Sequence, residues 1–135
     1  MKVAVRYFSR SGNTKKLAEA IAAALGVTAE TVDHPLTERV DALFLGSAVY
    51  AAGVDESIKT FLRENRERIG TLYNFSTAAL LPSTYKQVAK LAAENGISLS
   101  DREFHCRGAF AMLHRGHPDA QDLEAAAAFA RSALR

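Results

Sequence analysis

Residues 7–16, with the sequence YFSRSGNTKK, lie between a run of β-branched and aromatic residues and a pattern typical of a helix. They bring hydroxyl and amide side chains and one glycine to the point where a first strand would pass into a first helix. Backbone N–H groups in a tight loop before a helix form an anion site, which the helix dipole strengthens. Ser, Thr and Asn side chains add hydrogen-bond donors, and glycine lets the backbone approach a ligand closely. The stretch therefore predicts a phosphate-binding loop.

The residue types in this loop also indicate which kind of phosphate it would hold. The loop lacks the G-x-x-x-x-G-K-[ST] pattern of nucleoside-triphosphate sites and the G-x-G-x-x-G pattern of dinucleotide sites. Side-chain hydroxyls suit a terminal phosphate monoester, because its oxygens are exposed to several donors at once. Any one of these residues alone would equally suit a turn or a helix cap, but their combination after a first strand favours a phosphate site.

Strand-like and helix-like segments alternate along the rest of the chain. Strands are expected at residues 2–8, 27–32, 42–47, 71–77 and within 98–106, and helices at 14–25, 55–70, 83–96 and 117–135. Gly26, Gly70 and Gly96 are expected to end the first three helices, and Pro118 to lie in the first turn of the last. Residues 33–41 are too few for a crossover helix, so a single turn or an irregular loop is expected there. The alternation predicts a doubly wound, five-stranded parallel sheet with helices on both faces.

Ligands of open parallel sheets bind outside the carboxyl ends of the strands, and polar or small residues follow several of the predicted strands. The third strand is followed by GSAVYAAG (46–53) and the fourth by STAALLPST (76–84). Together with the loop at residues 9–14, these segments form a candidate ligand site at one edge of the sheet.

Composition limits the classes of protein that remain. A chain of 135 residues, 48% of them apolar and 24% charged, is expected to form one globular domain. Its apolar runs are shorter than the roughly 18 residues of a membrane span, and its N-terminus is too charged for a signal peptide. Cys106 is the single cysteine, which excludes an internal disulfide and a four-cysteine metal site. We expect a cytoplasmic protein, and the net charge of +2 is too small to indicate nucleic acid as a partner.

Residues 7–22, YFSRSGNTKKLAEAIA, resemble the phosphate-binding signature of flavodoxins, in which an aromatic residue ends the first strand and S/T-x-S/T-G-N-T follows. Residues 43–53, LFLGSAVYAAG, are similar to the second flavin loop of that family, and the order of elements matches across nearly the whole chain. The resemblance implies the strand order 2-1-3-4-5, non-covalently bound FMN, and single-electron transfer between transient redox partner proteins by a monomer or weak dimer.

The resemblance also implies which residues would hold FMN. The phosphate would be bound by Ser9, the backbone of Arg10, Ser11, Gly12, Asn13 and Thr14, and the isoalloxazine, mostly through backbone groups, by Ser47, Ala48, Val49, Tyr50, Ser76, Thr77, Ala78 and Ala79. Many flavodoxins have a glycine directly after the second-loop aromatic residue, whose peptide hydrogen-bonds the flavin N5. Here two alanines intervene, so Gly53 is the candidate for that role. Tyr50 is expected to stack on the flavin, with Tyr85 as the reserve.

Several other residues are given structural roles. Arg6 is a charge in a central strand, and we expect it to pair with a carboxylate. Cys106 is expected to be a small buried hydrophobic residue. His114 and His117 lack nearby carboxylates or thiols, so they are interpreted as loop residues and not as metal ligands. The sequence indicates neither catalytic nor metal-binding residues.

Three functions remain open after this reading. The first is an FMN-dependent electron carrier, the second an FMN-dependent NAD(P)H:quinone-type oxidoreductase, and the third a flavin-free binding module with the same fold. Charge adds an expectation to the first two. Residues 42–54 and 71–93 contain no Asp or Glu, and several basic residues precede Glu19, namely Lys2, Arg6, Arg10, Lys15 and Lys16. A reduced, anionic flavin would therefore be less disfavoured than in an acidic relative.

Overall fold

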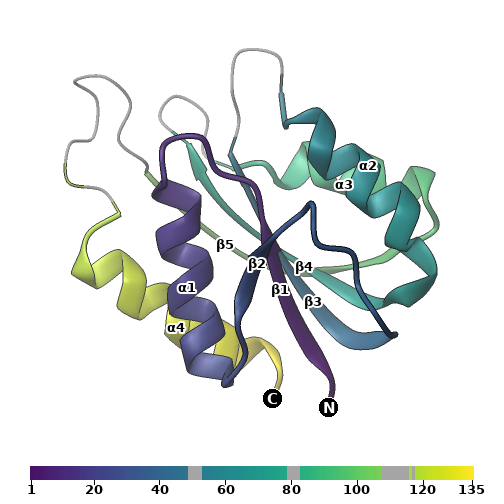
Figure 1. The fold of residues 1–135 in the computed structure, drawn as a ribbon. Coiled ribbons are helices and arrows are strands. Elements are labelled where there is room, and N and C mark those ends of the chain that lie inside the picture. Colours follow the sequence, from purple (N-terminus) through teal and green to yellow (C-terminus); the bar gives the residue numbers. More distant parts are fainter. Residues whose placement is uncertain (49–52, 79–82, 108–115, 117) are drawn as a thin grey trace.

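A five-stranded parallel sheet forms the centre of the molecule, with the strand order β2-β1-β3-β4-β5 (Figure 1). The strands are β1 (Val3–Tyr7), β2 (Ala29–Thr31), β3 (Val40–Ala48), β4 (Ile69–Ala78) and β5 (Ser98–Arg107). This computed structural model describes residues 1–48, 53–78, 83–107, 116 and 118–135. The predicted doubly wound fold and its strand order are confirmed.

Helices cover both faces of the sheet (Figure 1). α1 (Asn13–Leu25) and α4 (Ala120–Ala133) lie on one face, and α2 (Glu56–Asn65) and α3 (Tyr85–Glu94) on the other. A short 3₁₀ helix, η1 (Arg66–Arg68), follows α2. Helices on both faces explain why β3 reads as a continuous apolar run: both sides of that strand are buried.

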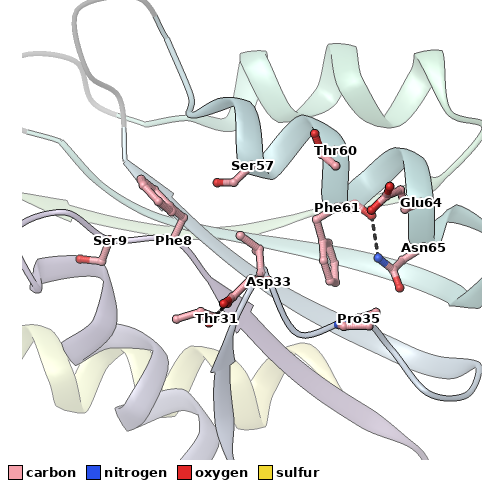
Figure 2. A pocket seen from close by; sticks show the side chains of 11 residues that line it. Phe8, Ser9, Thr31, Asp33, Pro35, Ser57, Thr60, Phe61, Glu64 and Asn65 are labelled. Carbon is pink, nitrogen blue, oxygen red and sulfur yellow. Dashed lines mark hydrogen bonds between the residues drawn. The ribbon is translucent and has the colours of Figure 1, made fainter.

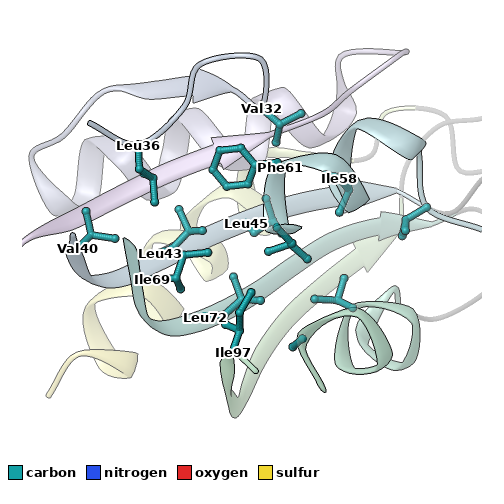
Figure 3. Packing of buried hydrophobic residues seen from close by; sticks show 14 residues of the cluster. Val32, Leu36, Val40, Leu43, Leu45, Ile58, Phe61, Ile69, Leu72 and Ile97 are labelled. Carbon is teal, nitrogen blue, oxygen red and sulfur yellow. The ribbon is translucent and has the colours of Figure 1, made fainter. Parts of the chain in front are cut away.

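Successive side chains of each strand enter opposite cores, because they point to alternate faces of the sheet. Leu43 and Leu45 of β3 pack with residues of α2 and α3 in the core shown in Figure 3. Phe44, between them, belongs to the other core, where Leu17 and Ile21 of α1 meet it. Each of these five side chains is fully buried, which is worth roughly 1.5–3 kcal/mol for a large apolar residue.

Two of the expected helix boundaries are wrong, and close packing explains the first. Gly70 does not end a helix, because α2 stops at Asn65 and Gly70 lies inside β4. A Cβ at Gly70 would lie 2.6 Å from the carbonyl oxygen of Asp41, so the glycine serves the close approach of β3 and β4. Pro118 precedes α4 instead of lying in its first turn, because Asp119 is the N-cap. The expected helix end at Gly26 is confirmed.

Residues 32–39 connect β2 to β3 without a helix, as predicted, and buried polar side chains hold this connection in place. Arg6 is 8% exposed and its guanidinium donates to the carbonyl of His34 at 2.9 Å. The Nη2 atom of Arg6 lies 3.2 Å from Glu30 Oε2, which confirms the predicted pairing with a carboxylate. From α2, Asn65 Oδ1 accepts the Leu36 N–H at 2.9 Å. These bonds replace the packing that a crossover helix would supply.

Candidate cofactor site

Three neighbouring strands, β1, β3 and β4, end at the same edge of the sheet (Figure 1). In the parallel register Tyr7 of β1 pairs with Gly46 of β3, and Ala48 of β3 pairs with Thr77 of β4. The chain leaves all three strands at their carboxyl ends, next to one another. The fold therefore places the carboxyl ends of β1, β3 and β4 side by side, which is where open parallel sheets bind ligands.

The loop after β1 is closed by its own hydroxyl groups. Ser9 Oγ accepts the Gly12 N–H at 2.9 Å, and Ser11 Oγ accepts the Asn13 N–H at 3.5 Å. Gly12, with φ of 89°, is the residue before α1 and has no side chain to cap that helix. The first turn of α1 contains no acidic residue. Such a helix start, with N–H groups and a positive dipole end, suits an anion.

Thr14 joins this first loop to β3 and β4. Its side chain is buried, its Oγ1 lies 2.9 Å from the Thr77 hydroxyl, and it also donates to the Ser47 carbonyl at 3.5 Å. Gly46 makes this approach possible, because a Cβ there would lie 2.9 Å from the Thr14 methyl group and 2.3 Å from the Phe75 ring. Gly46 was not predicted as a site residue, although a glycine inside an apolar strand signals close packing.

The side chains of Ser47, Ser76 and Thr77 are buried near the carboxyl ends of β3 and β4. Ser47 Oγ donates to Thr84 Oγ1 at 2.9 Å, and the Thr84 N–H donates to Ser76 Oγ at 3.3 Å. Because these hydroxyls are already hydrogen-bonded within the protein, the three residues would contact a ligand through their backbone groups. The resemblance to flavodoxins implies the same kind of contact. Ala48 and Ala78 end their strands beside them.

Some predicted residues lie outside the described part of the chain, and two unpredicted ones join the network. Val49, Tyr50 and Ala79 are outside it. Gly53 is described, half-buried and at φ of 99°.

Asn74 and Thr84, which were not predicted from the sequence, are fully buried and hydrogen-bonded to each other. An asparagine inside the apolar strand 71–77 was the available signal, because a buried amide needs partners.

Acidic residues reach the loops from other elements. Arg10 Nη2 lies 3.3 Å from Asp55 Oδ1, and Asp55 also caps α2 by accepting the Ser57 N–H at 3.0 Å. Hydrogen bonds from Ser57, together with Arg10, hold the pKa of Asp55 below its usual value. Glu103 of β5 accepts from the Ser83 hydroxyl at 2.9 Å and lies 2.7 Å from His105 Nδ1. The acid-free segments of the sequence therefore have carboxylates as spatial neighbours.

A cavity of about 700 Å³ lies beside the first loop, between the end of β1, residues 31–35 and α2 (Figure 2). Phe8 and Ser9 border it on one side, and Ser57, Thr60 and Phe61 on the other. It occurs where the connection between β2 and β3 has no helix to cover this face of the sheet. The loop residues 10–14 do not line it.

Three further expectations have different outcomes. Cys106 is half-buried, packs against the core of α1 and α4, and burial raises the pKa of its thiol to about 12. Tyr85, the reserve stacking residue, donates its hydroxyl to the Ser100 carbonyl at 3.0 Å. His114 and His117 lie outside the described residues. Within the described ranges, no group of three metal-binding side chains gathers, and no helix is long and apolar enough to cross a bilayer.

A five-stranded parallel sheet in the order β2-β1-β3-β4-β5 with helices on both faces defines a doubly wound α/β protein. A model of the flavodoxin domain matches residues 4–111, and the chain belongs to the flavodoxin family. An uncharacterized protein of Methanocaldococcus jannaschii is 28% identical, with 100% of this chain and 99% of that protein covered.

Solved structures show the same fold at low sequence identity. A flavodoxin from the domain Archaea has a TM-score of 0.79 and 19% identity, covering 98% of this chain and 95% of the other. Flavodoxin 1 from Bacillus cereus has a TM-score of 0.75 and 18% identity, covering 99% and 97%. A flavodoxin, WrbA-like protein from Agrobacterium tumefaciens has a TM-score of 0.73 and 22% identity, covering 98% and 94%.

Proposed function

We propose that this protein binds FMN non-covalently at the carboxyl edge of its sheet and carries electrons between transient redox partner proteins. The observation that supports this most is the start of α1. A loop of hydroxyl-bearing residues leads into a helix whose N-cap is a glycine and whose first turn has no acid. FMN carries a terminal phosphate and a redox-active ring, so it would supply both the anion for this loop and the electron-transfer chemistry.

The residues of the first loop fit a phosphate monoester. Ser11 is exposed at the loop surface, and Gly12 has open space around the position where a Cβ would lie. Ser9 closes the turn that precedes α1 by accepting the Gly12 N–H, and Asn13 is the first residue of that helix. In this proposal the loop binds the phosphate through backbone N–H groups and hydroxyls, and Lys15 and Lys16, both exposed, add positive charge nearby.

The ring would lie between the second and third loops. The buried network under Ser47 and Ser76 fixes where these loops leave the sheet. In this proposal backbone groups at residues 47–50 and 76–79, with Gly53, contact the ring, and Tyr50 stacks on it. The lone half-buried cysteine fits the reducing conditions of a cytoplasmic protein.

The test is a fluorescence titration of the purified protein with FMN and with riboflavin, which lacks the phosphate. We expect FMN to bind at least about a hundred-fold more tightly, because several charge-assisted hydrogen bonds depend on the phosphate. Equal affinity for the two flavins would contradict the phosphate assignment. If neither flavin binds, the protein would instead be the flavin-free binding module. Turnover of NADPH with a quinone, in the absence of any reductase, would instead indicate the oxidoreductase.

A further inference from the structure

Thr84 occupies a position where a threonine side chain ordinarily caps a helix, but its hydroxyl does something else. It is the N-cap residue of α3, and its side chain makes no capping hydrogen bond. The neighbouring Ser83 hydroxyl accepts the Tyr85 N–H at 3.0 Å instead. The Thr84 side chain is fully buried and turned into the sheet. Because N-cap hydroxyls normally stabilise their own helix, this orientation needs a separate reason.

The Thr84 hydroxyl connects two strands of the sheet. It accepts from Ser47 Oγ on β3 at 2.9 Å and from Asn74 Nδ2 on β4 at 3.1 Å. It also lies 3.3 Å from Asn74 Oδ1, to which it donates. A hydroxyl has one donor and two acceptor positions, so this group is fully used. With all three side chains 0–1% exposed, water cannot replace any of these partners.

The same residue also ties the start of α3 to the sheet. The Thr84 backbone N–H donates to Ser76 Oγ at 3.3 Å, so the residue before α3 is tied to β4 near its carboxyl end. Ser47, the other partner of Thr84, stands where β3 leads into the second loop. One residue thus links β3, β4 and the start of α3.

We propose that Thr84 is a positioning residue for the flavin ring, because it ties together β3 and β4 near the carboxyl ends between which the ring would bind. The inference rests on the proposed FMN function and adds to it a residue that would touch no part of the cofactor. The hydrogen bonds that close the phosphate loop, at Ser9 and Ser11, do not involve Thr84, and Thr14 reaches only the backbone carbonyl of Ser47, so the Thr84 hydroxyl is expected to act mainly on the ring.

The experiment compares Thr84→Val with the unchanged protein in titrations with FMN and riboflavin. Valine keeps the shape of threonine but leaves the Ser47 hydroxyl and the Asn74 amide without a buried partner. We expect both flavins to bind about ten-fold more weakly, while the ratio of the two affinities stays unchanged, since the phosphate loop is intact. Thr84→Ser keeps the hydroxyl and should restore binding to within about two-fold.

Asn65→Ala is the matched control. Asn65 is 3% exposed and makes two hydrogen bonds, to the Leu36 N–H and the Phe61 carbonyl, but it lies on α2 away from these loops. We expect it to lower the urea midpoint as Thr84→Val does, with no change in the dissociation constant for FMN. Should Thr84→Val fail to fold, Ser47→Ala breaks the same link from β3 and is judged in the same way.

The outcomes separate the two proposals. If the unchanged protein binds FMN and Thr84→Val binds both flavins with unchanged affinity, Thr84 serves stability alone and the inference is wrong. A selective loss of FMN over riboflavin would also overturn it, because the phosphate loop would then be what changed. If the unchanged protein binds neither flavin, the proposed function fails first, and the inference with it.

Discussion

Helices α1 and α4 pack against each other on one face of the sheet, yet their N-termini are built in opposite ways. At α4, Asp119 accepts the Asp122 N–H and Asp122 accepts the Asp119 N–H, each at 2.9 Å, which forms a capping box. At α1 the N-cap is Gly12, with no side chain. A helix start left without an acidic cap has N–H groups and a dipole that an external anion can satisfy. The difference distinguishes an end built for stability from one suited to binding.

The largest effect is expected from making the start of α1 resemble that of α4. Gly12→Asp places a carboxylate where the phosphate would bind, and like charges about 6 Å apart repel by about 3 kcal/mol at an effective dielectric of 20. We expect FMN affinity to fall at least about a hundred-fold in a fluorescence titration. Gly12→Asn has the same shape and the same strain at φ of 89°, without the charge, and should lose far less. Equal losses in the two variants would show that backbone strain, and not charge, is responsible.

Thr14→Val removes the hydroxyl that joins the first loop to β4. The hydroxyl lies 2.9 Å from Thr77 Oγ1, and in the proposed function it also serves the phosphate. Loss of a buried polar partner or of a charged hydrogen bond should weaken FMN binding by about 1–3 kcal/mol. Thr77→Val removes the same contact from the other side. If Thr77→Val weakens FMN as much as Thr14→Val does, the Thr14 hydroxyl acts through packing of the loops and not on the phosphate.

Asp119→Ala, at the start of α4, should lower the stability of the protein and leave its affinity for FMN unchanged. Loss of this cap is expected to lower the free energy of unfolding by about 1 kcal/mol, measured by urea denaturation. FMN affinity should not change, because in the proposed function the ligand would bind at the start of α1 and not at the capping box of α4. A weaker FMN complex in this variant would mean that the two helix starts are energetically coupled through the contact of α1 with α4.

The charge around the proposed flavin predicts an effect of about 1 kcal/mol or less on the reduced cofactor. Residues 42–54 and 71–93 lack acids, although Asp55 and Glu103 approach from other elements. We expect the potential for the second electron to be less negative than in acidic relatives, because an anionic reduced flavin meets fewer negative charges. A redox titration at low salt measures it. A potential as negative as in those relatives would show that enclosure of the ring outweighs surface charge.

The smallest effect is expected at the start of α2, on the stability of the protein at acidic pH. The pKa of Asp55 is held below its ordinary value of 3.8 by its hydrogen bonds with Ser57 and by Arg10. Its stabilising contribution is therefore present above pH 3.8 and is lost as the pH falls through the lowered pKa. Urea unfolding of Asp55→Asn should show a shallower loss of stability at acidic pH than the unchanged protein. If both proteins lose stability in parallel as the pH falls, Asp55 does not contribute to acid unfolding.

Much of the fold was predictable because it depends on short-range patterns. Hydrophobic periodicity marked the strands and helices, and the shortness of residues 33–41 predicted the connection without a helix. The loop at residues 9–14 was recognisable because its residue types and its place before a helix are contiguous in the chain. Gly70 was misread because a glycine after a helical pattern looks like a helix end, whereas the approach of Asp41 from a neighbouring strand is what requires it.

By itself the sequence determined the order of the elements, the doubly wound sheet and the loop suited to an anion. The tertiary structure alone decided which hydroxyls bond to one another: Thr14 with Thr77, and Thr84 with Ser47. It likewise brought the carboxylate of Asp55 to Arg10, which lies in the loop at residues 9–14, whose own sequence contains no acidic residue. The physical reason is the distance along the chain over which each kind of interaction acts. Helix periodicity and loop chemistry act between near neighbours in the chain, but a buried hydrogen bond depends on strand register and helix packing, which join residues tens of positions apart.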